Sequence, residues 1–310
     1  MAAIKKVAVL GGSGNIGPSI IKALLDSNFE VTAITRLESQ ATFVEGVDVK
    51  RVDITSKEAV QQVLRGHDAL VSAISPAALD DQKTIVDAAV AAQVRRFLPS
   101  EFGVDNRRTE EKDMGWMVVN KVKLNEYLDQ VAAKHKWFSW TGVACGFFFD
   151  WGLMGRNKGI QTQFILGINA QAKTGEIVDS GNKPWAATNT YFVGETVAAI
   201  LKKPEETANK FLNVFSFKTT QNEVLKIFEE ESGSTYQVSH VKGSDLLEAA
   251  TARVANGDYK QSIGPFVQYV FFADGVRSPV DLEANDGEQL GIKDKAELRD
   301  SIKRELSLLN

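Results

Sequence analysis

A glycine-rich segment near the start of the chain has the spacing of a phosphate-binding loop. Its residues fit Gly-x-Gly-x-x-Gly when counted from Gly12, and Gly-x-x-Gly-x-x-Gly when counted from Gly11, and both patterns end at Gly17. Glycines so spaced allow a tight turn, close approach of the backbone to a pyrophosphate, and close helix–strand packing. The segment follows an apolar run at 7–10 and precedes a helical pattern at 18–25, as dinucleotide binding requires. A flexible turn is the alternative interpretation.

Residues after the next two predicted strands indicate which dinucleotide would bind. An acid about 20 residues beyond the glycines would bind the ribose 2′-hydroxyl of NAD, but the second strand ends in Thr35 and Arg36. A guanidinium there can pair with a 2′-phosphate and stack on adenine, so the sequence favours NADPH (NADP+). Glu38 lies close enough to weaken this preference, and a solvated surface arginine is the alternative. Asp53, after the third strand, is a candidate acceptor for the adenine amino group or, equally, an acid at a helix N-terminus.

One lysine is the candidate catalytic group. None of the five tyrosines is followed four residues later by lysine, so the tyrosine–lysine pair of many enzymes with this glycine pattern is absent. A helix predicted over 116–134 has an apolar face formed by Met117, Leu124, Leu128 and Val131. Lys121 lies within this stripe, where burial would lower its pKa and make it a base near neutral pH, whereas Lys123 lies on the polar face. A lysine whose stem packs on the stripe while its amine reaches water is the alternative.

Composition disfavours several other kinds of site. The 310 residues include 36 basic and 40 acidic ones, and the net charge of −4 argues against nucleic acid as a partner. The single cysteine, Cys145, excludes an internal disulfide and a cysteine-based zinc site, and three widely spaced histidines disfavour a histidine-rich metal site. The chain has no apolar run of membrane-spanning length and no signal-peptide pattern. We therefore expect a cytoplasmic protein with no bound metal.

The hydrophobic pattern predicts the elements that position these residues. Apolar runs alternate with helical patterns, which indicates an α/β fold with a Rossmann-type, doubly wound parallel sheet. Strands are expected at 7–10, 30–35, 47–52, 68–74, 96–98, 137–142 and 211–217. Helices are expected at 18–25, 56–65 (capped by Ser56), 81–92, 116–134, 193–201 and 221–230, and the charged tail at 293–304 is expected to be a solvated helix.

The regular alternation weakens beyond Phe147, and this predicts two unequal domains. We expect a dinucleotide-binding domain over 1–152 and a smaller, interleaved substrate domain over 153–310. Segments at about 190–217 are expected to return to the Rossmann sheet.

Several segments resemble one known family. The glycine loop, Arg36 and above all the string Arg96-Phe-Leu-Pro-Ser-Glu-Phe-Gly103 resemble the NmrA-like, isoflavone reductase-like group of atypical short-chain reductases. The resemblance covers roughly the first half of the chain. It implies a Rossmann domain with a small C-terminal substrate domain, NADPH as cofactor, and Lys121 as the catalytic lysine. The chain lacks the basic residues that plant members carry after this lysine, and its segment 139–152 is more similar to fungal members.

Together these features predict an NADPH-dependent reductase of a small aromatic, phenolic or conjugated carbonyl compound, with Lys121 moving a phenolic or enolic proton. The candidate cofactor contacts are Gly11, Gly12, Ser13, Gly14, Asn15, Ile16, Gly17, Arg36, Asp53, Ser75 and Lys121. The candidate substrate contacts are Ser100, Phe102, Phe147, Phe148 and Trp151, with core packing as the alternative for the aromatic run. We expect a monomer or homodimer without nucleic-acid or membrane partners. The competing hypothesis is a non-catalytic NmrA-like regulator that binds NAD(P) as a redox signal.

Overall fold

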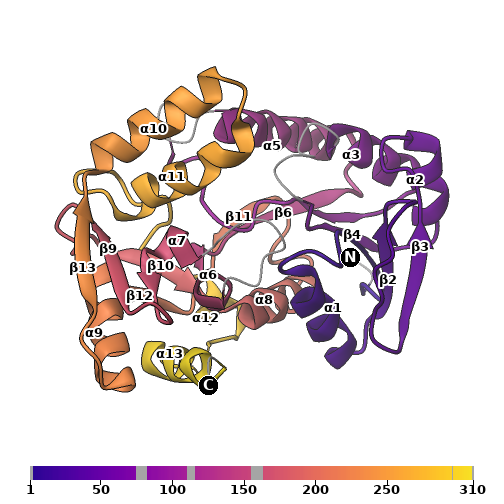
Figure 1. The fold of residues 1–310 in the computed structure, drawn as a ribbon. Helices are drawn as coiled ribbons and strands as arrows, with labels where there is room; N and C mark the ends of the chain where they lie inside the picture. Colours follow the sequence, from indigo (N-terminus) through magenta and orange to yellow (C-terminus); the bar gives the residue numbers. More distant parts are fainter. Residues whose placement is uncertain (1–2, 75–81, 110–115, 155–162, 295, 309–310) are drawn as a thin grey trace.

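A parallel β-sheet covered by helices on both faces forms one half of the molecule (Figure 1). The computed structural model describes residues 3–74, 82–109, 116–154, 163–294 and 296–308. In this part of the chain the large sheet has seven strands, each parallel to its neighbours. In spatial order they are β11 (Lys210–Asn213), β6 (Ser139–Ala144), β5 (Arg96–Leu98), β4 (Ala69–Ser72), β1 (Lys6–Leu10), β2 (Glu30–Thr35) and β3 (Val47–Arg51).

Two groups of helices bury the faces of this sheet. On one face α1 (Gly17–Asp26) packs against α8 (Thr190–Lys202), and Gly194 lets the two backbones approach, because a Cβ there would lie 2.2 Å from the Ser19 carbonyl oxygen. The other face is covered by α2 (Lys57–Leu64), α3 (Gln82–Ala91) and α5 (Trp116–Lys134). Ser56 caps α2 as predicted, since its hydroxyl accepts a hydrogen bond from the Ala59 amide at 3.3 Å.

Smaller sheets and helices form the other half. One three-stranded sheet has the order β12 (Phe217–Thr219), β10 (Trp185–Thr188), β7 (Phe147–Phe148), and another has the order β13 (Gln237–Val241), β9 (Thr174–Val178), β8 (Ile168–Asn169). The helices around them are α6 (Phe149–Met154), α7 (Gln163–Leu166), α9 (Gln221–Ser232), α10 (Gly243–Ala255), α11 (Tyr259–Phe272), α12 (Gly287–Leu290) and α13 (Leu298–Ser307). The fully buried Trp185 lies at their centre, with its ring against those of Phe147, Phe149 and Phe272.

The predicted fold class is confirmed, but two strand boundaries are wrong. The segment predicted as one strand at 211–217 divides into β11 of the large sheet and β12 of a smaller one. Its backbone changes partners between them, because the Val214 amide donates to Ala144 and the Ser216 amide to Ala187. The strand predicted at 137–142 begins at Ser139, since residues 135–138 form a turn closed by a bond from the Phe138 amide to the His135 carbonyl.

The C-terminal tail also differs from its prediction. The helix begins at Leu298 rather than at 293, and it is not solvated all round. Leu298, Ile302 and Leu306 fall at a four-residue spacing and pack into the core of the small sheets, where Ile302 is fully buried. The tail therefore covers part of this core.

Segments beyond residue 152 contribute to the large sheet through α8 and β11. Where the domain division falls remains a prediction. No helix in the described part of the chain is long and apolar enough to cross a membrane.

Candidate active site

The glycine-rich loop lies at the carboxyl edge of the large sheet, where the strand order reverses. From β1 the chain continues to β2 and β3 on one side, whereas β4, β5 and β6 lie on the other. The loops after β1 and β4 therefore leave the sheet in opposite directions. In open α/β sheets, ligands bind at this kind of switch point.

Two glycines of the loop are required by its geometry. Gly11 has φ of +85°, and a Cβ on it would lie 2.4 Å from the carbonyl oxygen of Ala73, just after β4. A Cβ on Gly17 would lie 2.4 Å from the Gly12 oxygen and 2.5 Å from the Gly11 oxygen. The loop is folded back on itself, with the Gly14 amide donating to the Gly11 carbonyl at 2.9 Å. A flexible turn would not need such close contacts.

The start of α1 is open to an anion. Ile16 stands at the N-cap position and makes no side-chain capping bond, and the first turn of α1 holds no acidic residue. Ser13, Gly14 and Asn15 precede it and are exposed. The amide groups at a helix N-terminus attract negative charge, so these residues fit the phosphates of a dinucleotide.

The predicted adenosine contacts are exposed. Arg36 follows β2, and its Nε lies 3.4 Å from Glu38 Oε1, with 72% of the arginine side chain exposed. Asp53 accepts hydrogen bonds from the Thr55 amide at 3.0 Å and the Thr55 hydroxyl at 2.7 Å, and these bonds lower the pKa of Asp53. This turn leads into α2 and fits the second interpretation of Asp53, an acid near a helix start. Ser75 lies outside the described residues.

Lys121 is buried, as its place in the apolar stripe predicts. Its residue exposure is 8%, and Leu124, Leu128 and Val131 of the same face are also buried, whereas Lys123 is exposed. The alternative, a lysine whose amine reaches water, is therefore wrong. The Lys121 Nζ donates to the backbone oxygen of Glu101 at 3.3 Å and lies 3.5 Å from Glu101 Oε2.

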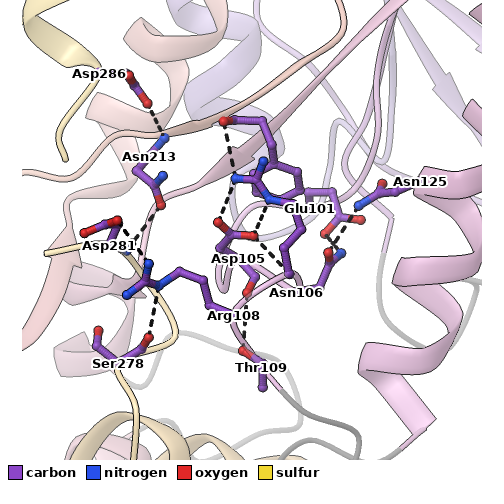
Figure 2. Close-up of polar contacts among 12 residues, drawn as sticks. Glu101, Asp105, Asn106, Arg108, Thr109, Asn125, Asn213, Ser278, Asp281 and Asp286 are labelled. Carbon is purple, nitrogen blue, oxygen red and sulfur yellow. Dashed lines mark hydrogen bonds and ion pairs between the residues drawn. The ribbon is translucent and has the colours of Figure 1, made fainter. Parts of the chain in front are cut away.

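Glu101 stands on the loop after β5 and is fully buried. Its carboxylate accepts a hydrogen bond at 3.0 Å from Asn106 Nδ2, and Asn106 in turn accepts one at 3.3 Å from Asn125 Nδ2 of α5 (Figure 2). Burial raises the pKa of Glu101 to about 7, although the charge of Lys121 acts in the opposite direction. The carboxyl group can therefore gain or lose a proton near neutral pH.

Further polar contacts hold this loop to distant parts of the chain. Asp105 forms a two-pronged ion pair with Arg107, whose guanidinium lies over the Phe211 ring of β11. Arg108 pairs with Asp281 at 3.0 Å (Figure 2). The position of Glu101 thus depends on β11 and on the C-terminal segment.

The predicted substrate contacts lie in different surroundings. Ser100 is half-buried, and its hydroxyl donates to the Ile74 carbonyl at 2.8 Å. Phe102 and Phe147 belong to hydrophobic cores, as the alternative interpretation of the aromatic run expects. Phe148 and Trp151 are half-buried and meet edge to face. That these side chains face a substrate remains a prediction.

Glu101 is the residue that the sequence prediction missed. It stands in the string of 96–103 that carries the family resemblance, next to Phe102 and three residues after the buried strand β5. A carboxylate in such apolar surroundings needs a buried partner. This was the available signal, and the partner is Lys121.

Comparisons with known proteins identify the family of the chain. The pattern that defines the NmrA-like family matches residues 3–270. Oxidoreductase aprR of Aspergillus flavus is 32% identical over 255 residues, which cover 81% of this chain and 82% of the relative. Isoflavone reductase homolog P3 of Arabidopsis thaliana is 23% identical over 261 residues, with 79% and 80% covered.

A solved structure is also similar along almost the whole chain. The structure of AtPrR2 with NADP+ and (+)pinoresinol has a TM-score of 0.77 and 20% identity, and the match covers 98% of this chain and 99% of that one. At this identity the likeness shows a shared fold.

Proposed function

Because the chain belongs to the NmrA-like family and is an oxidoreductase of the isoflavone reductase-like type, we propose that it reduces a small aromatic, phenolic or conjugated carbonyl compound with NADPH. In this proposal residues 1–152 form the NAD(P)-binding domain, which also carries the candidate substrate contacts between Ser100 and Trp151, and residues 153–310 form a smaller substrate-binding region. Lys121 is the catalytic base. The buried amine of Lys121 beside the carboxyl group of Glu101 is the observation that carries the proposal.

The residues around the glycine loop fit NADPH. Close packing at Gly11 and Gly17 leaves no room for side chains, and α1 begins without a cap or an acid. Arg36 is exposed at the end of β2, where its guanidinium can pair with a 2′-phosphate. The presence of NADP+ in the AtPrR2 structure supports the same cofactor here. When bound, NADPH supplies the hydride.

Lys121 has the surroundings that a base needs. Only 8% of Lys121 is exposed, and Glu101 provides a group with which it can share a proton. A neutral amine at this place accepts the phenolic or enolic proton of the substrate, and the resulting shift makes a carbon of the substrate electrophilic toward hydride. The (+)pinoresinol in the AtPrR2 structure supports a phenolic substrate class. Phe148 and Trp151 supply half-buried aromatic surface for such a ring.

The test is NADPH consumption by wild-type protein and two lysine variants over a panel of phenolics, quinones and enones. General acid–base catalysis contributes about 10²- to 10⁴-fold, so Lys121→Ala should lower kcat by at least about 100-fold. Lys123→Ala is the matched control, because Lys123 is exposed two residues further along α5. Its kcat should stay within about twofold of wild type, as an exposed charge contributes little.

Unchanged turnover in Lys121→Ala, with fold and NADPH affinity intact, would show that Lys121 is not the base. NADPH binding by the wild type without turnover on any substrate, together with capture of a protein partner, would instead support the regulator. The named oxidoreductase among the relatives favours the enzyme.

A further inference from the structure

We propose that Glu101 is a positioning residue that acts through Lys121: it holds the lysine amine in place and receives its proton, so that the lysine becomes neutral without releasing a proton to solvent. This inference rests on the proposed function, because it requires Lys121 to be the base. It gives the buried acid beside the proposed base a defined part in the reaction, as the acceptor of the lysine proton.

The amine of Lys121 contacts two different groups of Glu101, its backbone oxygen and its carboxylate. The Lys121 Nζ contacts the backbone oxygen of Glu101 at 3.3 Å and the carboxylate of the same residue at 3.5 Å. The side chains are 10% and 1% exposed, so bulk water does not stand between them. The two contacts fix the direction of the amine, and the carboxylate is within reach of its proton.

The carboxyl group is itself held by hydrogen bonds. Asn106 donates to Glu101 Oε2, and Asn125 supports Asn106 from α5, the helix that carries Lys121 (Figure 2). Glu101 Oε1 has no hydrogen-bond partner among the residues that the structure describes. Oε2 is therefore oriented by the Asn106 amide and lies beside the lysine, while Oε1 accepts no hydrogen bond from the described residues.

The charges that face this pair come from three elements. Asp105 and Arg107 lie on the loop of Glu101, where they largely neutralise each other through their two-pronged ion pair. Lys121 faces Glu101 from α5, and the buried thiol of Cys145, after β6, faces Lys121. Burial raises the pKa of Cys145 to about 12, so the thiol remains neutral and the lysine–glutamate pair carries the proton chemistry.

The proton balance is simple. The ammonium of Lys121 gives one proton to the carboxylate of Glu101, which leaves a neutral amine and a neutral carboxylic acid. The amine then accepts the proton of the substrate hydroxyl, so the pair has gained one proton and the substrate has lost one. That proton returns to the product or to solvent when the site opens. Burial disfavours charged groups, so it lowers the cost of forming the neutral pair from the ionic one.

These proton-transfer steps predict how the activity depends on pH. The pKa of Glu101 is raised to about 7, so below that pH the carboxyl group already holds a proton and cannot accept one from Lys121. The kcat/KM of the wild type should therefore rise as the pH increases through about 7. A glutamate with a purely structural role would not produce this rise, which is the acidic limb of the pH profile.

The experiment compares Glu101→Gln, Glu101→Asp and a matched control, with kcat, KM, NADPH affinity and the pH profile measured for each. Glu101→Gln should lower kcat by about 100-fold, keep KM and the NADPH dissociation constant within about threefold, and remove the limb near neutral pH. Glu101→Asp keeps an acid one methylene further away, so it should recover part of the activity and retain a limb. Glu305→Gln is the control, because Glu305 is also a buried glutamate (5% exposed) but belongs to α13. It should keep wild-type kinetics.

A double variant separates this inference from the proposed function. If Glu101 acts through Lys121, adding Glu101→Gln to Lys121→Ala should cause no further loss of kcat. Independent, multiplying losses would overturn the role of Glu101, as would wild-type kcat in Glu101→Gln, an unmoved pH profile, or an aspartate variant no better than the glutamine one. If Lys121→Ala itself stays active, the lysine base is refuted, whatever Glu101 does.

Discussion

Substituting alanine for Gly17 should weaken NADPH binding by deforming the phosphate loop. Gly17 is the first residue of α1, and an added Cβ would lie 2.4 Å from the Gly12 oxygen and 2.5 Å from the Gly11 oxygen. Ordinary contacts begin near 3.4 Å. The start of α1 and the loop must therefore separate by about 1 Å, and both oxygens belong to backbone rather than to a flexible side chain.

The size of the effect follows from two costs. Forcing an extra methyl group into a packed site costs about 1–3 kcal/mol of stability. A hydrogen bond to a charged group contributes about 1.5–3 kcal/mol, and misalignment of one such bond between an amide and a phosphate would weaken binding by roughly 10- to 150-fold. We expect a dissociation constant for NADPH that rises within this range and a lower free energy of unfolding.

The assay is a calorimetric or fluorescence titration with NADPH, accompanied by denaturant unfolding. Gly175→Ala is the matched control, since Gly175 lies in β9 and a Cβ there would make only ordinary contacts, at 3.4 Å or more, with Leu225 and Val238. The control should bind NADPH like the wild type and gain up to about 1 kcal/mol of stability, because alanine leaves the unfolded chain less conformational freedom than glycine does. A folded Gly17→Ala protein that binds NADPH as tightly as the wild type would refute the assignment of this loop to the phosphates.

Three further outcomes are expected. Arg36→Ala should weaken NADPH binding at least about tenfold and NADH binding much less, because the 2′-phosphate contact is lost for NADPH alone. Titration with both dinucleotides checks this, and equal loss for both would contradict it. Trp185→Ala should lower the free energy of unfolding by about 3–5 kcal/mol, since the ring is fully buried. Arg299→Ala removes a partly exposed ion pair and should lower it by less than about 1 kcal/mol. Urea unfolding measures both. Because the pKa of Glu101 is raised from 4.5 to about 7 on folding, the stability that it contributes is fully present below pH 4.5 and lost as the pH rises through about 7. The free energy of unfolding of the wild type minus that of Glu101→Gln should therefore fall as the pH rises through this range.

Features set by neighbouring residues could be predicted from the sequence. The glycine loop lies between β1 and α1 because a short apolar run and a helical pattern flank it. Helical spacing places Lys121 in the apolar stripe, since Leu124, Leu128 and Val131 lie about one, two and three turns further along α5. In both cases the interactions that decide the outcome are local.

Features set by distant contacts could not be predicted. The strand predicted at 211–217 divides because its amides find partners on two different strands, β6 and β10, which the local pattern does not indicate. Arg96 lies in β5 and is only 1% exposed, because Thr141 and the Pro204 carbonyl accept its guanidinium hydrogens. From the sequence alone an arginine is expected to be exposed to solvent, because the acceptors that allow its burial are not visible there. The helix at Leu298–Ser307 is similar, since its charged composition conceals a four-residue apolar spacing.

The candidate proton-transfer pair combines both kinds of feature. Lys121 owes its burial to its own helix, but the position of Glu101 depends on a loop that the rest of the chain holds. The Asp105 amide donates to the Pro279 carbonyl, and Arg108 pairs with Asp281, so residues about 170 positions away fix the loop. The same C-terminal half that is proposed to contact the substrate therefore also positions the acid beside the lysine. A lysine in an apolar stripe can be found in the sequence, but the acid that would take its proton becomes apparent only when the loop, α5 and the C-terminal segment are placed together.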